Sequence, residues 1–142
     1  MRGVWKPVVA LAWIVLLSSG APGCGSIVED AHNLVSDPPT IAEVEVGDEV
    51  VTVTSARSDP SRQGVAQLRA GQWAKSVALL EAARLEDPEH ADNLFALGVA
   101  YEKNGQDREA LDAYEAANLR YKGAGNSDAT VAVRRLRRKL GQ

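Results

Sequence analysis

Hydrophobic residues recur at intervals of three and four from about residue 60 to the end of the sequence, which is typical of amphipathic helices. Leu94, Leu97 and Tyr101, for example, fall on one helical face. Asn104-Gly105 then ends that helix, because Gly takes the left-handed conformation of a C-cap without strain. The pattern predicts helices near residues 60–70, 73–86, 91–103 and 107–121, and a fifth over 128–140.

The segment before the helices has a different pattern. In residues 41–54, β-branched residues roughly alternate with polar ones, and Gly47-Asp48 interrupts them as in a type II′ hairpin turn. This register pairs Val44 with Val51, and one face of the hairpin becomes mostly apolar. An isolated two-stranded hairpin is only marginally stable in water. A hairpin within 41–56 therefore needs a surface to pack on, and the alternative is an extended, partly disordered segment.

The helical region repeats itself with a period of 34 residues. This shift superimposes Gly64 on Gly98 and Gly71 on Gly105. A period of this length indicates a solenoid of helix–turn–helix units, each burying its apolar face against the next. Gly98 and Ala110 are small, which predicts that the two helices of a unit cross closely there.

These positions resemble the signature of tetratricopeptide repeats. The second unit carries the small and large residues of that signature at Leu94, Leu97-Gly98, Tyr101, Ala110, Tyr114 and Ala117. The first unit lacks the large apolar residues of the first helix but matches at Gly64, Leu80, Ala83 and Pro88. The resemblance covers residues 57–124. It implies an all-α fold of about two helix–turn–helix repeats, with a concave face that binds another protein or a peptide.

In that family, the first helix of each pair lines the concave face. The corresponding positions here are Ser61, Val65, Leu68 and Arg69 in the first unit, and Asp92, Phe95, Val99, Glu102 and Lys103 in the second. The paired Lys and Asn that clasp a C-terminal carboxylate in some members are missing. Phe95 and Val99 instead make the groove partly apolar, suited to an apolar or helical segment. The alternative is that these two residues pack in the core or against the N-terminal segment.

The predicted C-terminal helix divides into an apolar stripe and basic faces. The stripe consists of Ala129, Ala132, Val133, Leu136 and Leu140, and the basic residues are Arg134, Arg135, Arg137, Arg138 and Lys139. Terminal repeats need a polar outer side, so residues 125–142 are expected to form a capping helix. Its basic faces either are solvated or bind anionic lipid, a cell-wall polymer or an acidic partner.

Residues 1–23 have the layout of a secretory signal peptide. Arg2 and Lys6 precede an apolar run from Val8 to Leu17, and small residues follow. This run is shorter than the ~20 residues that a membrane-spanning helix needs. All of these features place the body of the protein outside the cytoplasm.

The end of this segment resembles a bacterial lipoprotein signal, through Ala21-Pro22-Gly23-Cys24. The resemblance implies that Cys24 becomes the lipidated N-terminus, and Gly25 rather than Asp after it implies an outer-membrane location that faces the periplasm. Residues 24–40 then form a flexible tether. The alternatives are an ordinary secretory signal, with Cys24 as a stray thiol, and an uncleaved signal anchor.

Composition and charge narrow the function classes. The formal net charge of −3 gives no electrostatic footprint for nucleic acid, and none is expected as a partner. The single cysteine rules out an internal disulfide framework and a Cys-rich zinc site. His32 and His90 stand alone, and the pair His90 and Asp92 supplies only two metal ligands. Neither a metal, a cofactor nor an enzymatic activity is therefore expected.

The sequence predicts a non-catalytic protein–protein interaction module, an exported adaptor or scaffold lipoprotein anchored in the envelope and facing the periplasm. The alternative function is a structural or anchoring subunit of a larger envelope machine, such as one for secretion, pilus or outer-membrane assembly. The alternative location is soluble, in the periplasm or secreted.

Overall fold

The computed structural model describes residues 38–121 and 127–142, which belong to one unit, Val35–Gln142. Among these residues, none of the helices combines the length and the apolar composition that a membrane crossing requires. The predicted signal peptide over 1–23, the predicted lipidation site Cys24 and most of the predicted tether over 24–40 lie outside the described residues.

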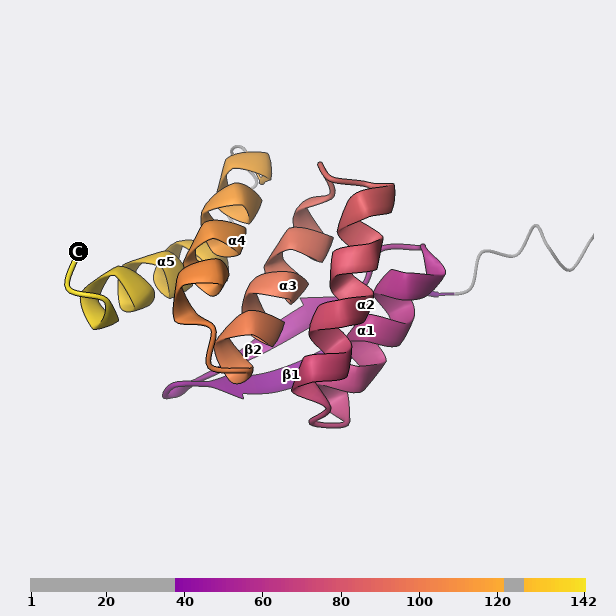
Figure 1. Ribbon diagram of the computed structural model, residues 1–142, viewed down its shortest axis with the longest axis horizontal. Helices are drawn as coiled ribbons and strands as arrows, with labels where there is room; N and C mark the ends of the chain where they lie inside the picture. Colours follow the sequence, from indigo (N-terminus) through magenta and orange to yellow (C-terminus); the bar gives the residue numbers. More distant parts are fainter. Residues whose placement is uncertain (1–37, 122–126) are drawn as a thin grey trace, which may run out of the picture. The chain divides into compact units, whose positions relative to one another are not determined.

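A hairpin of two strands precedes five helices (Figure 1). Each helix begins and ends within one residue of the bounds that the hydrophobic pattern predicts. The observed elements are β1 (Ile41–Val46), β2 (Glu49–Thr54), α1 (Asp59–Arg69), α2 (Trp73–Glu86), α3 (Ala91–Lys103), α4 (Asp107–Arg120) and α5 (Ser127–Lys139).

The two strands form the antiparallel hairpin that the alternating pattern predicts. Val44 lies opposite Val51, which confirms the register. Gly47 has a φ of 66° while Asp48 has a negative φ, as a type II′ turn requires. Because the register is the expected one, the alternating valines all lie on one face of the hairpin.

The two helix pairs, α1–α2 and α3–α4, share the same turn. In the second pair, Gly105 has a φ of 81° and donates its N–H to the carbonyl of Glu102, at 3.1 Å. Gln106 donates its N–H to the carbonyl of Tyr101, at 2.9 Å, which completes a Schellman motif. Gly71 occupies the same place in the first pair, with a φ of 72°.

The helices of each pair cross at a glycine, as the small residues predict. A Cβ added to Gly98 would lie 2.6 Å from Cδ1 of Tyr114, and one added to Gly64 would lie 2.6 Å from Cγ of Leu80. Both distances are far below van der Waals contact. Ser76 of α2 adds a hydrogen bond between the two helices, because its hydroxyl donates to the carbonyl of Gly64 of α1 at 2.8 Å.

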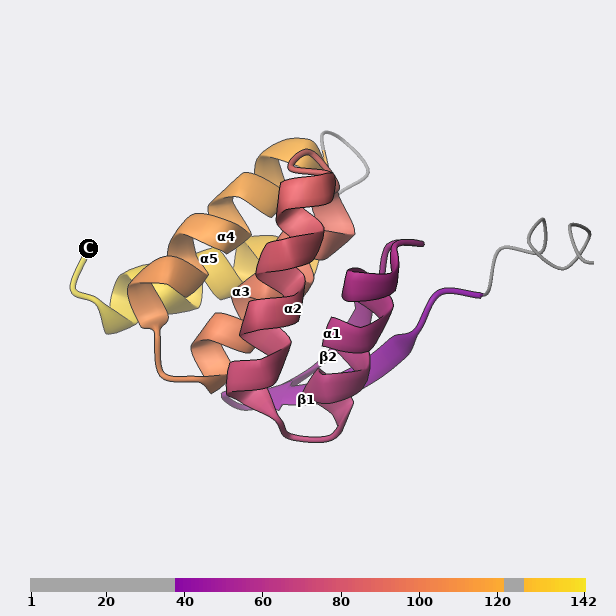
Figure 2. The ribbon, with the colours of Figure 1, turned by 45° about the vertical axis from the view of Figure 1, so that its right-hand side comes forward.

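The helices stack in chain order. α3 packs against both α2 and α4, and α5 packs against α4. On α5, Ala129, Ala132 and Leu136 are buried, so the predicted apolar stripe does face the array. Figure 2 shows the hairpin passing beneath α1, on one side of the stacked helices.

We expect Gly98→Leu to destabilise the protein, because its side chain has to displace the buried ring of Tyr114. Overpacking of this kind costs about 1–3 kcal/mol of unfolding free energy, measurable as a lower midpoint in urea denaturation. The matched control is Ala78→Leu, at an exposed position of α2, which should leave the midpoint nearly unchanged. Equal midpoints for Gly98→Leu and the wild type would remove the close crossing as a source of stability.

Candidate functional site

The concave face, formed by α1 and α3, is covered by the chain's own hairpin. β1 packs on α1, and both strands pack on α3. The hairpin contributes Val44, Val46, Val51 and Val53 to the core, and all four are at most 5% exposed. The hairpin thus has the packing surface that its marginal stability in isolation requires.

The apolar residues predicted to line the concave face lie beneath this cover. Val65, Leu68, Phe95 and Val99 are all buried. Phe95 also packs on the ring of Tyr114, with the ring centroids 5.5 Å apart. Phe95 and Val99 therefore pack in the core, beneath the hairpin, as the alternative interpretation of these two residues expected. Partner binding at this face stays a prediction.

The polar residues of the predicted groove contact other parts of the chain. Asp92 accepts a hydrogen bond from the hydroxyl of Tyr121, at 2.7 Å. Lys103 donates to the carbonyl of Glu45 in β1, at 2.9 Å, and its ammonium lies 5.1 Å from the ring centroid of Trp73. Ser61 is fully buried.

Arg69 differs from these groove residues because it is exposed, at the end of α1. It is therefore the predicted groove position that a partner could reach without moving the hairpin.

Glu102 is the centre of a network that joins α3, α4, α5 and the hairpin. It accepts two hydrogen bonds from Arg135 of α5, at 2.8 and 3.2 Å, and one from the hydroxyl of Tyr114 of α4, at 3.1 Å. Arg135 also reaches Glu49 of β2, at 3.7 Å. A bidentate Arg–carboxylate pair is among the stronger polar contacts, and Glu102 is only 11% exposed. Arg135 thus holds the capping helix against the array, and its guanidinium group is already engaged by these carboxylates.

The other predicted basic residues of α5 separate into two groups. Arg137 pairs with Glu115 at 2.7 Å, and Lys139 pairs with Asp107 at 2.7 Å. Arg134 and Arg138 are exposed, and within residues 38–121 and 127–142 neither forms an ion pair. The predicted basic patch is therefore reduced to these two arginines, which are the ones available to an anionic partner.

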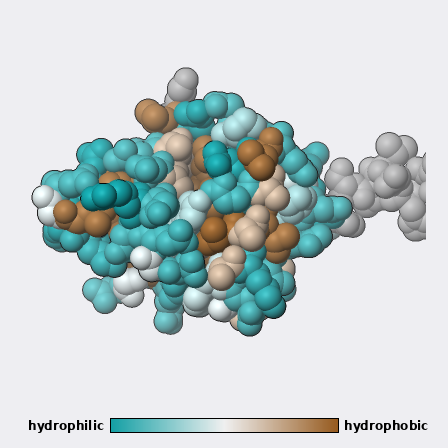
Figure 3. All heavy atoms as spheres, viewed as in Figure 1, coloured by the Kyte–Doolittle hydropathy of each residue, from teal (hydrophilic) through white to brown (hydrophobic). Residues whose placement is uncertain are grey.

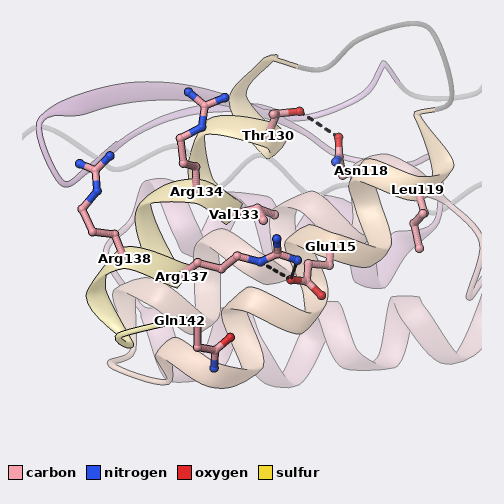
Figure 4. Close-up of a pocket in the computed structure, with 9 residues that line it drawn as sticks. All are labelled: Glu115, Asn118, Leu119, Thr130, Val133, Arg134, Arg137, Arg138 and Gln142. Carbon is pink, nitrogen blue, oxygen red and sulfur yellow. Dashed lines mark hydrogen bonds and ion pairs between the residues drawn. The ribbon is translucent and has the colours of Figure 1, made fainter.

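A groove runs between α4 and α5, and sequence reasoning missed it. We call it the α4–α5 groove; it encloses about 680 Å³. Figure 4 shows Arg137 reaching Glu115 across it, while Arg134 and Arg138 point away from Glu115. The sequence signal that could have indicated it is Leu119, an apolar residue near the end of α4; in the structure its side chain is 63% exposed. The residues that line the α4–α5 groove are Glu115, Asn118, Leu119, Thr130, Val133, Arg134, Arg137, Arg138 and Gln142.

Tyr101 and Tyr114 each donate a hydrogen bond to a carboxylate on a neighbouring helix. Burial, and next the negative charge of Glu102, raise the pKa of Tyr114 well above its ordinary value of 10. Burial, and next the hydrogen bond to Glu81, raise the pKa of Tyr101 to about 12. Both hydroxyls therefore stay protonated, as donors, to a higher pH than a free tyrosine does.

The described residues hold no group of three or more His, Cys, Asp or Glu side chains placed to bind a metal ion. His90 and Asp92 lie near the start of α3, together with the buried Asn93. Asn93 is engaged in the fold, because its side-chain oxygen accepts a hydrogen bond from the hydroxyl of Ser61.

Comparison with known families agrees with the architecture. Residues 92–124, which contain α4 and all of α3 except Ala91, match the model of the tetratricopeptide repeat family. The match supports a protein of this family, whose domains usually bind other proteins or peptides and are generally non-catalytic. Comparison with curated proteins and with solved structures found no match.

We expect the protein to lose stability as the pH rises above about 10. The pKa of a tyrosine in an unfolded chain is about 10, and the pKa values of Tyr101 and Tyr114 are higher in the folded state. Their contribution is therefore full below pH 10 and is lost as the pH rises toward 12 and beyond.

Urea denaturation at a series of pH values measures this loss. Tyr114→Phe keeps a buried ring without a titratable hydroxyl, so its unfolding free energy should fall less steeply above pH 10. Parallel curves for the variant and the wild type would assign the alkaline loss to other groups.

Proposed function

We propose that the protein is a non-catalytic adaptor that binds another protein and is held at the bacterial cell envelope. The observation that carries this proposal is the tetratricopeptide architecture, namely two helix pairs crossing at Gly64 and Gly98 and the family match over residues 92–124. Stacked pairs of this kind present a continuous surface to a partner.

The anchor in this proposal is a lipid on Cys24. Its support comes from the sequence: the charged start, the short apolar run and the single cysteine directly after Gly23. Gly25 after the cysteine favours the outer membrane, facing the periplasm. An ordinary secretory signal would leave the same domain soluble in the periplasm or secreted. Several acyl chains on one cysteine give stable anchoring, whereas a single chain is marginal.

The hairpin restricts how a partner reaches the concave face. Ala42, Val44, Val46, Val51 and Val53 are all at most 5% exposed against the helices. Displacing them exposes five apolar side chains, and each buried valine contributes about 1.5 kcal/mol or more. A partner therefore binds without displacing the hairpin, either at the rim near Arg69 or at another part of the helical array.

Cys24→Ser tests the anchor. We expect the wild-type chain to fractionate with membranes and to carry a mass increase from acyl groups at a new N-terminal Cys24. The variant should appear in the soluble fraction or accumulate as an uncut precursor, because serine offers no thiol to acylate. Ser26→Ala, two residues further on, is the matched control and should behave as wild type. An unchanged mass and location for Cys24→Ser would refute lipidation.

In-cell photo-crosslinking tests the adaptor role. A crosslinking amino acid in place of Arg69, at the exposed rim of the concave face, should give a discrete adduct with one other protein. The same residue in place of Lys75, exposed on α2, is the control and should give no such adduct. Adducts that contain only a second copy of this chain would speak for a self-assembling subunit of an envelope machine instead.

A further inference from the structure

The capping helix ends in the same way as the first helix of each pair. Gly141 has a φ of 73°, its N–H donates to the carbonyl of Arg138 at 3.3 Å, and Gln142 donates to the carbonyl of Arg137 at 2.9 Å. These are the bonds of the Schellman motif at Gly105. The backbone of α5 therefore repeats that of α3, with a shift of 36 residues.

The contact of α5 with α4 repeats the contact of α3 with α2. Tyr101 of α3 donates its hydroxyl to Glu81 of α2. At the corresponding positions, Arg137 of α5 donates to Glu115 of α4, at 2.7 Å. Glu81 and Glu115 are related by the 34-residue repeat of the sequence. α5 thus lies against α4 as the first helix of a further unit would.

The groove between α2 and α3 shows that the next helix of the array, α4, packs at such a position. α4 packs on α3 over that groove and contributes Ala113 and Ala116 to its lining, so that Leu97 of α3 is only 1% exposed and about 260 Å³ remains open. In the corresponding α4–α5 groove, Val133 takes the place of Leu97 but is only partly buried, and about 680 Å³ is open. No helix among the described residues covers the α4–α5 groove. On the face of the molecule that Figure 3 shows, hydrophobic residues lie among largely hydrophilic ones.

The charges of the α4–α5 groove define what fits it. Arg134 and Arg138 lie one helical turn apart on α5, and within residues 38–121 and 127–142 no carboxylate pairs with either. Arg134 stands where α3 has Gly98, so an incoming helix cannot approach α5 as closely as α4 approaches α3. Carboxylates on that helix would compensate by pairing with the two guanidinium groups. Leu119 and Val133 supply an apolar floor beside them.

We propose that the α4–α5 groove binds an amphipathic α-helix of a partner protein, with small or aliphatic residues on its contact face and two acidic residues one turn apart. The groove lies where the next helix of the array would pack, and a concave surface of this kind suits a helix better than the flat surface of a membrane. The proposal rests on the proposed adaptor function and assigns the class of partner and the surface that recognises it.

The test uses a synthetic helical peptide with alanine and leucine on one face and two glutamates four residues apart beside it. Fluorescence anisotropy should detect binding of this peptide to the full chain in detergent. Arg134→Glu combined with Arg138→Glu should weaken binding at least about tenfold, because like charges then face each other. A second peptide, with lysines in place of the two glutamates, should bind this double variant more tightly than the wild type.

Two equivalent leucines provide the control for the apolar floor. Leu119 is 63% exposed in the α4–α5 groove, and Leu85, 34 residues earlier on α2, is 78% exposed outside it. Both tolerate a polar side chain without loss of folding, because both are exposed. Leu119→Gln should weaken binding of the acidic peptide several-fold, and Leu85→Gln should leave it unchanged.

Four results would overturn the proposal. The acidic peptide could fail to bind, or bind the charge-reversed variant equally well. Arg134 and Arg138 could instead be needed for binding to vesicles of phosphatidylglycerol, which would make them a membrane contact. Sedimentation in the analytical ultracentrifuge could show a dimer that Leu119→Gln dissociates, which would mean that a second copy of this chain occupies the groove. The Arg69 crosslink is independent of the groove, so an adduct there without peptide binding rejects the groove while keeping the adaptor function.

Discussion

The crossing of each helix pair at a glycine is the contact on which the rest of the structure depends. Tyr114 lies over Gly98, and Leu80 lies over Gly64, at distances that no side chain on the glycine would permit. Because α2 of the first pair packs on α3 of the second, α1 and α3 come to lie on the same side of the array and form one apolar face. That face stabilises the hairpin, and the buried Tyr114 in turn supplies a hydrogen bond to Glu102. A single constraint of size therefore positions the helices, the hairpin and the polar network.

The hairpin changes the meaning of the family resemblance. The surface that a tetratricopeptide array offers to a partner is here filled by residues 41–54 of the same chain. Two repeats bury little apolar surface by themselves, and the hairpin enlarges the core without adding a third repeat. The molecule thus gains stability at the face that the family resemblance assigns to a partner, and the proposed adaptor function therefore uses the rim and the end of the array.

The basic residues of the capping helix divide into two groups that its sequence does not separate. Arg135, Arg137 and Lys139 attach it to carboxylates of the array, and Ala129, Ala132 and Leu136 bury its inner side. Arg134 and Arg138 do neither, and they border the α4–α5 groove.

The sequence by itself determined the elements of this protein, because their signals are local. Periodicity placed the five helices, Gly47-Asp48 set the hairpin register, and the pairing of small with large residues indicated the close crossings. The resemblance to tetratricopeptide repeats also placed Val65 and Phe95 on one shared face. What covers that face was decided only by the tertiary structure, since strands and helices distant in the chain meet there by packing. For the same reason, only the tertiary structure shows that Arg135 joins α5 to α3. Its carboxylate partner lies 33 residues away, and no local pattern distinguishes it from Arg134.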